Sequence, residues 1–155
     1  MPDYTIKDIL SNLWKKFWLS MFLPILLFVG VVILQKLEIR IIPPGSIRIW
    51  GILLFVLAAA FGAALPILQR TSFHDKILKD NNMNVPEYIE YQKRLFILCS
   101  IAVVPASFAY MFIVSPLYMY GSVLAALYGI YSILPFKDKI IKELKMYKID
   151  GQIEF

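Results

Sequence analysis

Four long stretches of this chain contain no Asp, Glu, Lys, Arg or His. They span residues 17–34, 49–68, 95–114 and 117–136. At about 1.5 Å per residue, a helix of this length crosses a hydrocarbon core about 30 Å thick. The pattern therefore predicts an all-α, polytopic membrane protein with four transmembrane helices, arranged as two antiparallel hairpins in a single membrane domain over residues 1–155.

The composition agrees with this prediction, because 59% of the residues are hydrophobic and only 17% are charged. Soluble domains average about a quarter charged residues, so a soluble fold with four buried helices is disfavoured. The single cysteine, Cys99, lies inside the third apolar run. No intrachain disulfide is therefore expected, and Cys99 is predicted to be a small packing residue.

The net charge of +5 is distributed unevenly between the loops. Thirteen Lys and Arg residues lie before the first run, between the second and third runs, or after the fourth, and three lie between the first and second runs. The positive-inside rule explains this bias better than nucleic-acid binding does. Both termini are predicted to be cytoplasmic, and frequent Lys, Ile, Asn and Tyr favour a prokaryotic plasma membrane. The first run could also belong to a signal peptide, but it is long for one, so we expect it to be retained.

The segments that flank the apolar runs are predicted to lie at the membrane interface. Residues 5–16 have apolar side chains at helical spacing and predict a short interfacial amphipathic helix before the chain enters the bilayer. The alternative is that they simply extend the first transmembrane helix. Residues 137–155 predict a basic amphipathic tail on anionic headgroups, and the alternative is a solvated tail. The predicted interface anchors are Trp14, Lys15, Lys16, Trp18, Arg48, Trp50, Arg94 and Lys137.

Residues 69–94 are expected to form a cytoplasmic helical hairpin that projects about 10 to 15 Å from the membrane. A turn is predicted at 81–84, and Pro86 suits the first turn of the following helix. This projection is the largest soluble surface between the predicted spans. Residues 70–94 are therefore the expected docking site for a cytoplasmic partner.

Small residues cluster on two of the predicted transmembrane helices. The residues on these faces are Gly51, Ala58 and Gly62, and Gly121, Ala125, Tyr128, Gly129 and Ser132. Small side chains let helix backbones approach closely in lipid. Two accounts remain open: packing within this bundle, or an interface reserved for another membrane subunit. Tyr128 and Tyr131 are expected to lie deep in the membrane and to find hydrogen-bond partners on neighbouring helices.

The sequence offers little for catalysis, and no catalytic residue, cofactor or metal is predicted. His74 and Asp75 form the only His-acid pair, in a loop that hardly supplies a substrate pocket, so a surface role is expected. Membrane enzymes, proton relays and coupled transporters usually place an ionisable side chain within the membrane. The four apolar runs contain none. An enzyme is therefore not expected.

The first functional hypothesis is a non-catalytic membrane subunit that positions the components of a larger complex, with the lipid bilayer and other membrane proteins as partners and no nucleic acid. The first alternative is a small transporter or channel for a neutral or apolar solute. A second alternative comes from the tail over 135–155, which resembles the stretch that follows a helix pair in assembly-platform proteins of type IV pili and archaella. That resemblance implies a role in secretion. It covers this tail alone, and the sequence holds no counterpart of that family's large cytoplasmic domain, so the family is not assigned.

Overall fold

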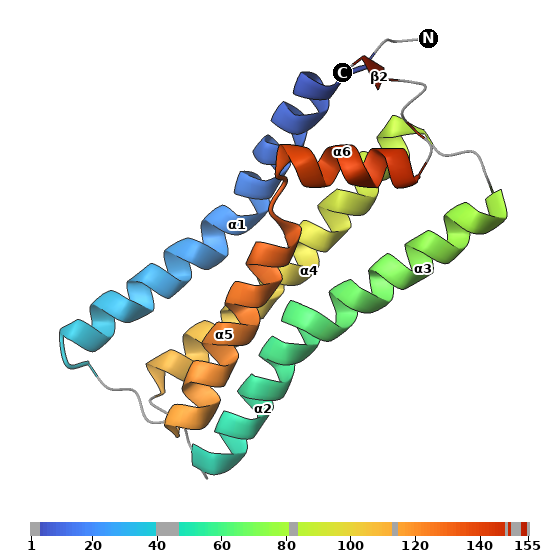
Figure 1. Ribbon diagram of the computed structural model, residues 1–155. Helices are drawn as coiled ribbons and strands as arrows, with labels where there is room; N and C mark the ends of the chain where they lie inside the picture. Colours follow the sequence, from blue (N-terminus) through green and yellow to red (C-terminus); the bar gives the residue numbers. More distant parts are fainter. Residues whose placement is uncertain are drawn as a thin grey trace.

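The computed structural model describes residues 4–39, 47–80, 84–112, 115–147, 149 and 153–154. Nearly all of them lie in helices, which run lengthwise in a bundle (Figure 1). The elements are β1 (Tyr4–Thr5), α1 (Ile6–Lys36), α2 (Ile47–Ala59), η1 (Ala60–Ala64), α3 (Leu65–Asp80), α4 (Val85–Met111), α5 (Pro116–Ile133), α6 (Lys137–Met146) and β2 (Ile153–Glu154). Most of the predicted turn at 81–84 and part of the tail lie outside the described residues.

Three helical segments are long and apolar enough to cross a membrane: α1, the continuous stretch from Arg48 to Ile77, and α4. A fourth span is added if α5 and α6, which are bent by 67° relative to each other, count as one broken span. The chain is therefore consistent with a multi-pass membrane protein.

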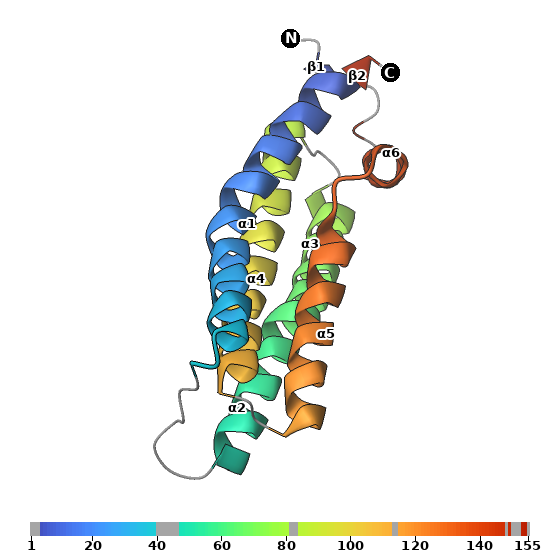
Figure 2. The same cartoon turned by 90° about the vertical axis from the view of Figure 1, so that its left-hand side faces the viewer.

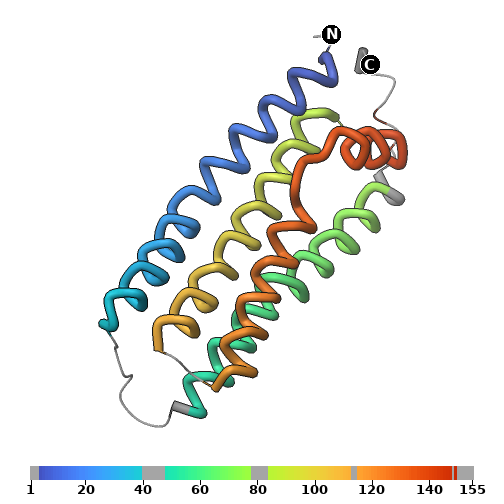
Figure 3. The backbone as a smooth tube through the Cα atoms, turned by 60° about the vertical axis from the view of Figure 1, so that its left-hand side comes forward, coloured from blue at the N-terminus to red at the C-terminus, as the bar shows by residue number. Residues whose placement is uncertain are grey.

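The predicted boundary between an interfacial helix over 5–16 and a membrane helix from residue 17 falls inside a single helix, α1. α1 runs without a break through this point. The reason is that its buried face continues on both sides of the boundary and packs along α4 (Figures 1 and 3). The buried residues at successive turns are Ile6, Ile9, Leu13, Phe17 and Met21.

α4 lies at the centre of the bundle and contacts α1, α2 and α5. Its buried residues occur all round the helix, as expected for an element with neighbours on several sides. α5 packs along α4 and also against α2 and η1. The two predicted antiparallel hairpins are thus not equivalent: α4 and α5 are close neighbours, whereas α1 has its extensive contact with α4 rather than with α2 (Figure 2).

The second apolar run is widened by the π-helical turn η1, in which the Leu65 backbone N–H donates to the Ala60 carbonyl. Pro66 follows directly and has no N–H, so the α-helical bond to the carbonyl of Gly62 cannot form. In membrane helices, a local π adjustment is one way to accommodate a backbone bond lost to proline. Gly62, within this turn, lies against α5.

α6 crosses one end of the bundle, where the N-terminal part of α1, the end of α3 and the start of α4 also lie (Figure 1). Ile140 and Leu144 of α6 are buried in one cluster with Leu13, Phe96 and neighbouring residues. This corrects the prediction that the apolar face of the tail lies on lipid headgroups. Pro135 stands between α5 and the bent-away α6, so the amphipathic face meets α1 and α4 instead. The parallel pair of β1 and β2 closes the same end.

Candidate functional site

A polar cleft of about 470 Å³ separates α3 from α4. It lies beyond the second apolar run and before the third, in the segment predicted to project from the membrane. Its lining comes equally from the two helices: Gln69, Ser72, Phe73 and Lys76 from α3, and Glu87, Glu90, Tyr91 and Arg94 from α4. We call this the α3–α4 cleft.

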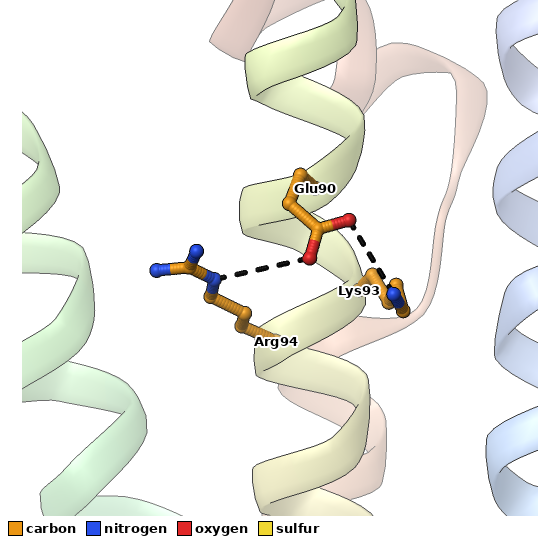
Figure 4. Close-up of polar contacts among 3 residues, drawn as sticks. All are labelled: Glu90, Lys93 and Arg94. Carbon is orange, nitrogen blue, oxygen red and sulfur yellow. Dashed lines mark hydrogen bonds and ion pairs between the residues drawn. The ribbon is translucent and has the colours of Figure 1, made fainter.

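Charges of both signs surround the α3–α4 cleft. Lys76 Nζ lies 4.0 Å from Glu87 Oε1 and links the two helices. On α4, the two carboxylate oxygens of Glu90 face Lys93 Nζ at 3.5 Å and Arg94 Nε at 4.0 Å (Figure 4). All of these side chains are well exposed, so each pair contributes at most about 1 kcal/mol to folding. They are better suited to recognition than to stability.

The inner wall of the α3–α4 cleft is aromatic. Phe73 stacks on Tyr91 with ring centroids 3.6 Å apart and the planes within 2° of parallel. Tyr147 packs edge-on against Phe73 at 5.5 Å. Burial raises the pKa of the Tyr147 hydroxyl above its ordinary value, with Glu143 acting in the same direction. The hydroxyl therefore stays protonated near neutral pH.

One oxygen in this wall has no partner. Gln69 Oε1 is buried and receives no hydrogen bond in the described part of the chain. A buried acceptor left unpaired costs about 1 to 3 kcal/mol. If the Gln69 amide turned toward the α3–α4 cleft and met an N–H or O–H donor there, this cost would be removed.

Behind this wall, a buried polar network joins α4 to α6. The Tyr88 hydroxyl donates to Glu143 Oε2 at 2.7 Å. Gln92 Nε2 donates to the same carboxylate oxygen at 2.6 Å and to the Tyr88 oxygen at 2.9 Å. Tyr88 and Gln92 are almost wholly buried, and the network pairs their polar atoms with one another. It therefore holds the tail helix on the bundle at little desolvation cost.

Two cations meet at the C-terminal end of α5. Arg70 Nη2 and Lys139 Nζ each donate to the Ser132 carbonyl oxygen at 2.5 Å. The last carbonyls of a helix have no intrahelical donors and carry partial negative charge, so cations are favourable there. Burial lowers the pKa of the Lys139 ammonium; Glu143 opposes this shift, and Arg70 adds to it.

The structure places most of the small residues inside the bundle. A Cβ on Gly62 would meet the Ala125 backbone, and one on Gly129 would lie 2.8 Å from the Gly62 carbonyl oxygen. A Cβ on Gly121 would meet the Phe55 ring at 2.7 Å. Gly51 and Ala58 are buried as well.

Tyr128 does not join the small residues of the bundle. Its side chain is 54% exposed, and that of Tyr131 is 70% exposed. The prediction that these two tyrosines seek partners within the bundle is therefore wrong. On the outer face of α5 their hydroxyls can reach lipid or water rather than a neighbouring helix.

The predicted interface anchors lie mainly on the outside of the bundle. Lys15, Trp18, Arg48, Trp50, Arg94 and Lys137 are exposed, and Trp14 and Lys16 are half-buried. Trp50 also packs edge-on against Phe112 at 6.5 Å, which ties the start of α2 to the end of α4. Exposure at these positions is what an interface anchor needs.

A second, apolar cleft of about 280 Å³ lies between α1 and α5, with α4 behind it. Its lining is entirely hydrophobic: Ile25 and Phe28 from α1, Val103 and Ala106 from α4, and Val123, Ala126, Leu127 and Ile130 from α5. All of these residues belong to the apolar runs. The apolar cleft therefore lies within the segments that are predicted to cross the membrane.

Sequence reasoning missed both the buried network and the pair of cations. Tyr88 and Gln92 are four residues apart on one helix face, which was a usable signal. Glu143 and Lys139 lie on α6, far along the chain from Gln92 and Arg70, and the bend between α5 and α6 brings these pairs together. Among the residues that the structure describes, no three His, Cys, Asp or Glu side chains are grouped so as to hold a metal ion.

Comparison of the chain with protein-family models, with curated proteins and with solved structures found no match.

Proposed function

We propose that this protein is a non-catalytic membrane subunit that holds a cytoplasmic partner at the α3–α4 cleft and so positions that partner at the plasma membrane. In this proposal the chain crosses the bilayer four times, with both termini and the α3–α4 cleft in the cytoplasm. The observation that carries the proposal is the α3–α4 cleft itself, a hollow lined by aromatic rings and charges of both signs. Gln69, whose side-chain oxygen is buried and unpaired among the described residues, belongs to that lining.

The packing of the small residues also favours this docking site. Gly62 and Gly129 already bring two helices of this chain into backbone contact. They are therefore not available to hold another membrane subunit by close helix approach. The α3–α4 cleft provides recognition groups outside the apolar runs instead.

The size and the lining of the α3–α4 cleft indicate what kind of partner would fit it. Its volume holds a few side chains rather than a folded domain, so we propose a protruding segment of another protein. That segment would place an N–H or O–H donor on Gln69 Oε1 and a flat apolar group against Phe73 and Tyr91. Its own charged side chains would pair with Lys76, Glu87 and Arg94 at the rim.

The test is purification of the tagged full chain from its native host in mild detergent, with quantitative mass spectrometry of the proteins that co-elute. Gln69→Leu should lower recovery of a stoichiometric partner at least tenfold. It should not lower the thermal stability of the protein, because it removes an unpaired buried oxygen. His74→Leu makes a similar polar-to-apolar change at an exposed site of α3 outside the α3–α4 cleft and should leave recovery unchanged. Absence of a reproducible partner, or equal recovery with both variants, would contradict the proposal.

The orientation has a separate test. Cysteines introduced at Glu38 and His74, in a Cys99→Ser background, should react with an impermeant thiol reagent from opposite sides of the membrane. Both positions are exposed in the structure. Labelling of both from the same side would rule out the proposed topology.

The apolar cleft favours a second candidate function, the binding or passage of a neutral, apolar solute. Ala106→Trp would fill this cleft from α4. Proteoliposomes should then lose uptake of a fluorescent apolar probe, whereas Leu124→Trp on the exposed face of α5 should retain it. No uptake above that of protein-free liposomes would reject this candidate.

A further inference from the structure

Arg70 and Lys139 bring two positive charges to one place in the bundle. The two side chains come from α3 and α6, and both donate to the single carbonyl oxygen of Ser132. Their donor nitrogens are each 2.5 Å from that oxygen and therefore lie close to one another. Both residues are half-buried. Two like charges this close are favourable only when negative charge compensates them.

Among the described groups that act on Lys139, Glu143 is the carboxylate, and it brings one negative charge against two cations. Its Oε2 atom also accepts hydrogen bonds from Tyr88 and Gln92. A backbone carbonyl carries only a partial charge. The pKa of Lys139 is lowered mainly by burial, and the neighbouring Arg70 adds to this shift. The pair therefore has room, electrostatically, for an external anion.

The level of these two cations in the bundle indicates which anion that is. The second apolar run ends at Leu68 and the fourth at Phe136. Arg70 and Lys139 follow shortly after these ends, and the Ser132 carbonyl closes α5 between them. In a bilayer, this is the level of the lipid phosphates, where basic pockets between helices bind headgroups.

We propose that Arg70 and Lys139 form a binding site for a phosphate group at the membrane surface, supplied by an anionic phospholipid headgroup or by soluble phosphate. The Arg70 guanidinium offers a planar fork of N–H donors, and the Lys139 ammonium offers a compact charge beside it. Tetrahedral phosphate oxygens accept from both groups at once. The bound anion ties α3 to α6 through the C-terminal end of α5. This site is separate from the α3–α4 cleft, and the proposal does not rest on the function suggested above.

The experiment measures thermal unfolding of the delipidated full chain in mild detergent. One arm adds dioleoylphosphatidylglycerol, and a matched arm adds dioleoylphosphatidylcholine at the same mole fraction. A third arm adds sodium phosphate against sodium chloride at constant ionic strength. A ligand that binds the folded state raises the unfolding midpoint in a saturable way, and the titration yields an apparent affinity.

The wild-type protein should respond to phosphatidylglycerol at concentrations at least tenfold lower than to phosphatidylcholine. Arg70→Gln and Lys139→Gln should each weaken the apparent affinity at least tenfold. Lys142→Gln removes one positive charge from an exposed position of the same helix and should leave the affinity within twofold. A response to sodium phosphate that is lost in the same two variants would support the site and identify the soluble anion as its source.

Three results would overturn the proposal. The first is an equal response of the wild type to both lipids together with no response to phosphate. The others are an equal loss of apparent affinity in Lys142→Gln and Lys139→Gln, or no loss of affinity in either Arg70→Gln or Lys139→Gln. Each would mean that Arg70 and Lys139 only cap α5. If the glutamine variants do not fold, Arg70→Lys and Lys139→Arg keep the charge while changing the geometry. The charge-preserving variants should then retain the preference for phosphatidylglycerol.

Discussion

Replacing Gly129 with alanine tests the backbone contact between α5 and η1. A Cβ at this position would lie 2.8 Å from the carbonyl oxygen and 3.0 Å from the Cα of Gly62. Ordinary contacts of a Cβ begin at 3.4 Å, so both distances are too short. The obstructing atoms belong to the backbone and cannot turn aside. The two helices would therefore have to separate.

The expected cost follows from two opposing effects. Overpacking a well-packed interior costs about 1 to 3 kcal/mol. Alanine is favoured over glycine inside a helix by about 1 kcal/mol, which offsets part of that cost. We expect Gly129→Ala to lower the free energy of unfolding by about 1 to 2 kcal/mol after this offset.

Gly30 provides a matched control, because a Cβ built there meets nothing within 4 Å. It lies inside α1, so Gly30→Ala gains the same helix propensity without the clash and should be neutral or stabilising. The assay is unfolding by an ionic detergent in mixed micelles, followed by circular dichroism. If Gly129→Ala proves as stable as Gly30→Ala, the close contact between α5 and η1 does not exist and the packing argument fails.

Three further predictions concern the end of the bundle that carries α6. Tyr88→Phe removes the hydroxyl that links Glu143 and Gln92 and should destabilise the protein by about 1 to 3 kcal/mol in the same unfolding assay, whereas an unchanged value would contradict the network. Leu144→Ala should lower the free energy of unfolding by about 2 to 5 kcal/mol because Leu144 is fully buried, whereas Met146→Ala, at an exposed position, should leave it almost unchanged. Equal effects of the two substitutions would show that α6 does not pack on the bundle. The lowered pKa of Lys139 means that the unfolded chain binds more protons between the folded-state pKa and 10.5, so stability should rise as pH increases through that window. Lys139→Met should flatten that rise in thermal unfolding, and an identical slope in both proteins would argue against the burial of the ammonium.

Some features of this protein were readable because they depend only on local chain chemistry. A membrane-length run without charge is excluded from water whatever its neighbours are, so the apolar helices were predictable. The Pro-containing start of α4 follows equally from local sequence. The α3–α4 cleft lies in the region between the second and third runs, and the docking of a partner there stays a prediction.

Other features were misread because one pattern has two physical solutions. An amphipathic face can be buried on lipid headgroups or on protein, and periodicity does not distinguish the two. Ile9 of α1 and Leu144 of α6 are buried in the same cluster. The apolar faces of the two helices therefore pack within the protein rather than on lipid. For the tyrosines of α5 the error has the opposite sense, because side chains that were predicted to be inside the bundle are exposed. Their hydroxyls suggested buried partners, yet Tyr128 and Tyr131 lie on the outer face.

The sequence by itself determined that the chain is helical, how many apolar runs it has and where its cationic segments lie, because these follow from hydropathy and charge along one dimension. Only the tertiary structure decided which helices are neighbours and what they do with their polar groups. The bend of 67° after α5 carries Lys139 to Arg70 and Glu143 to Tyr88, and the partners in each pair are far apart in the sequence. Such pairs are set by the packing of whole helices, which no local pattern encodes.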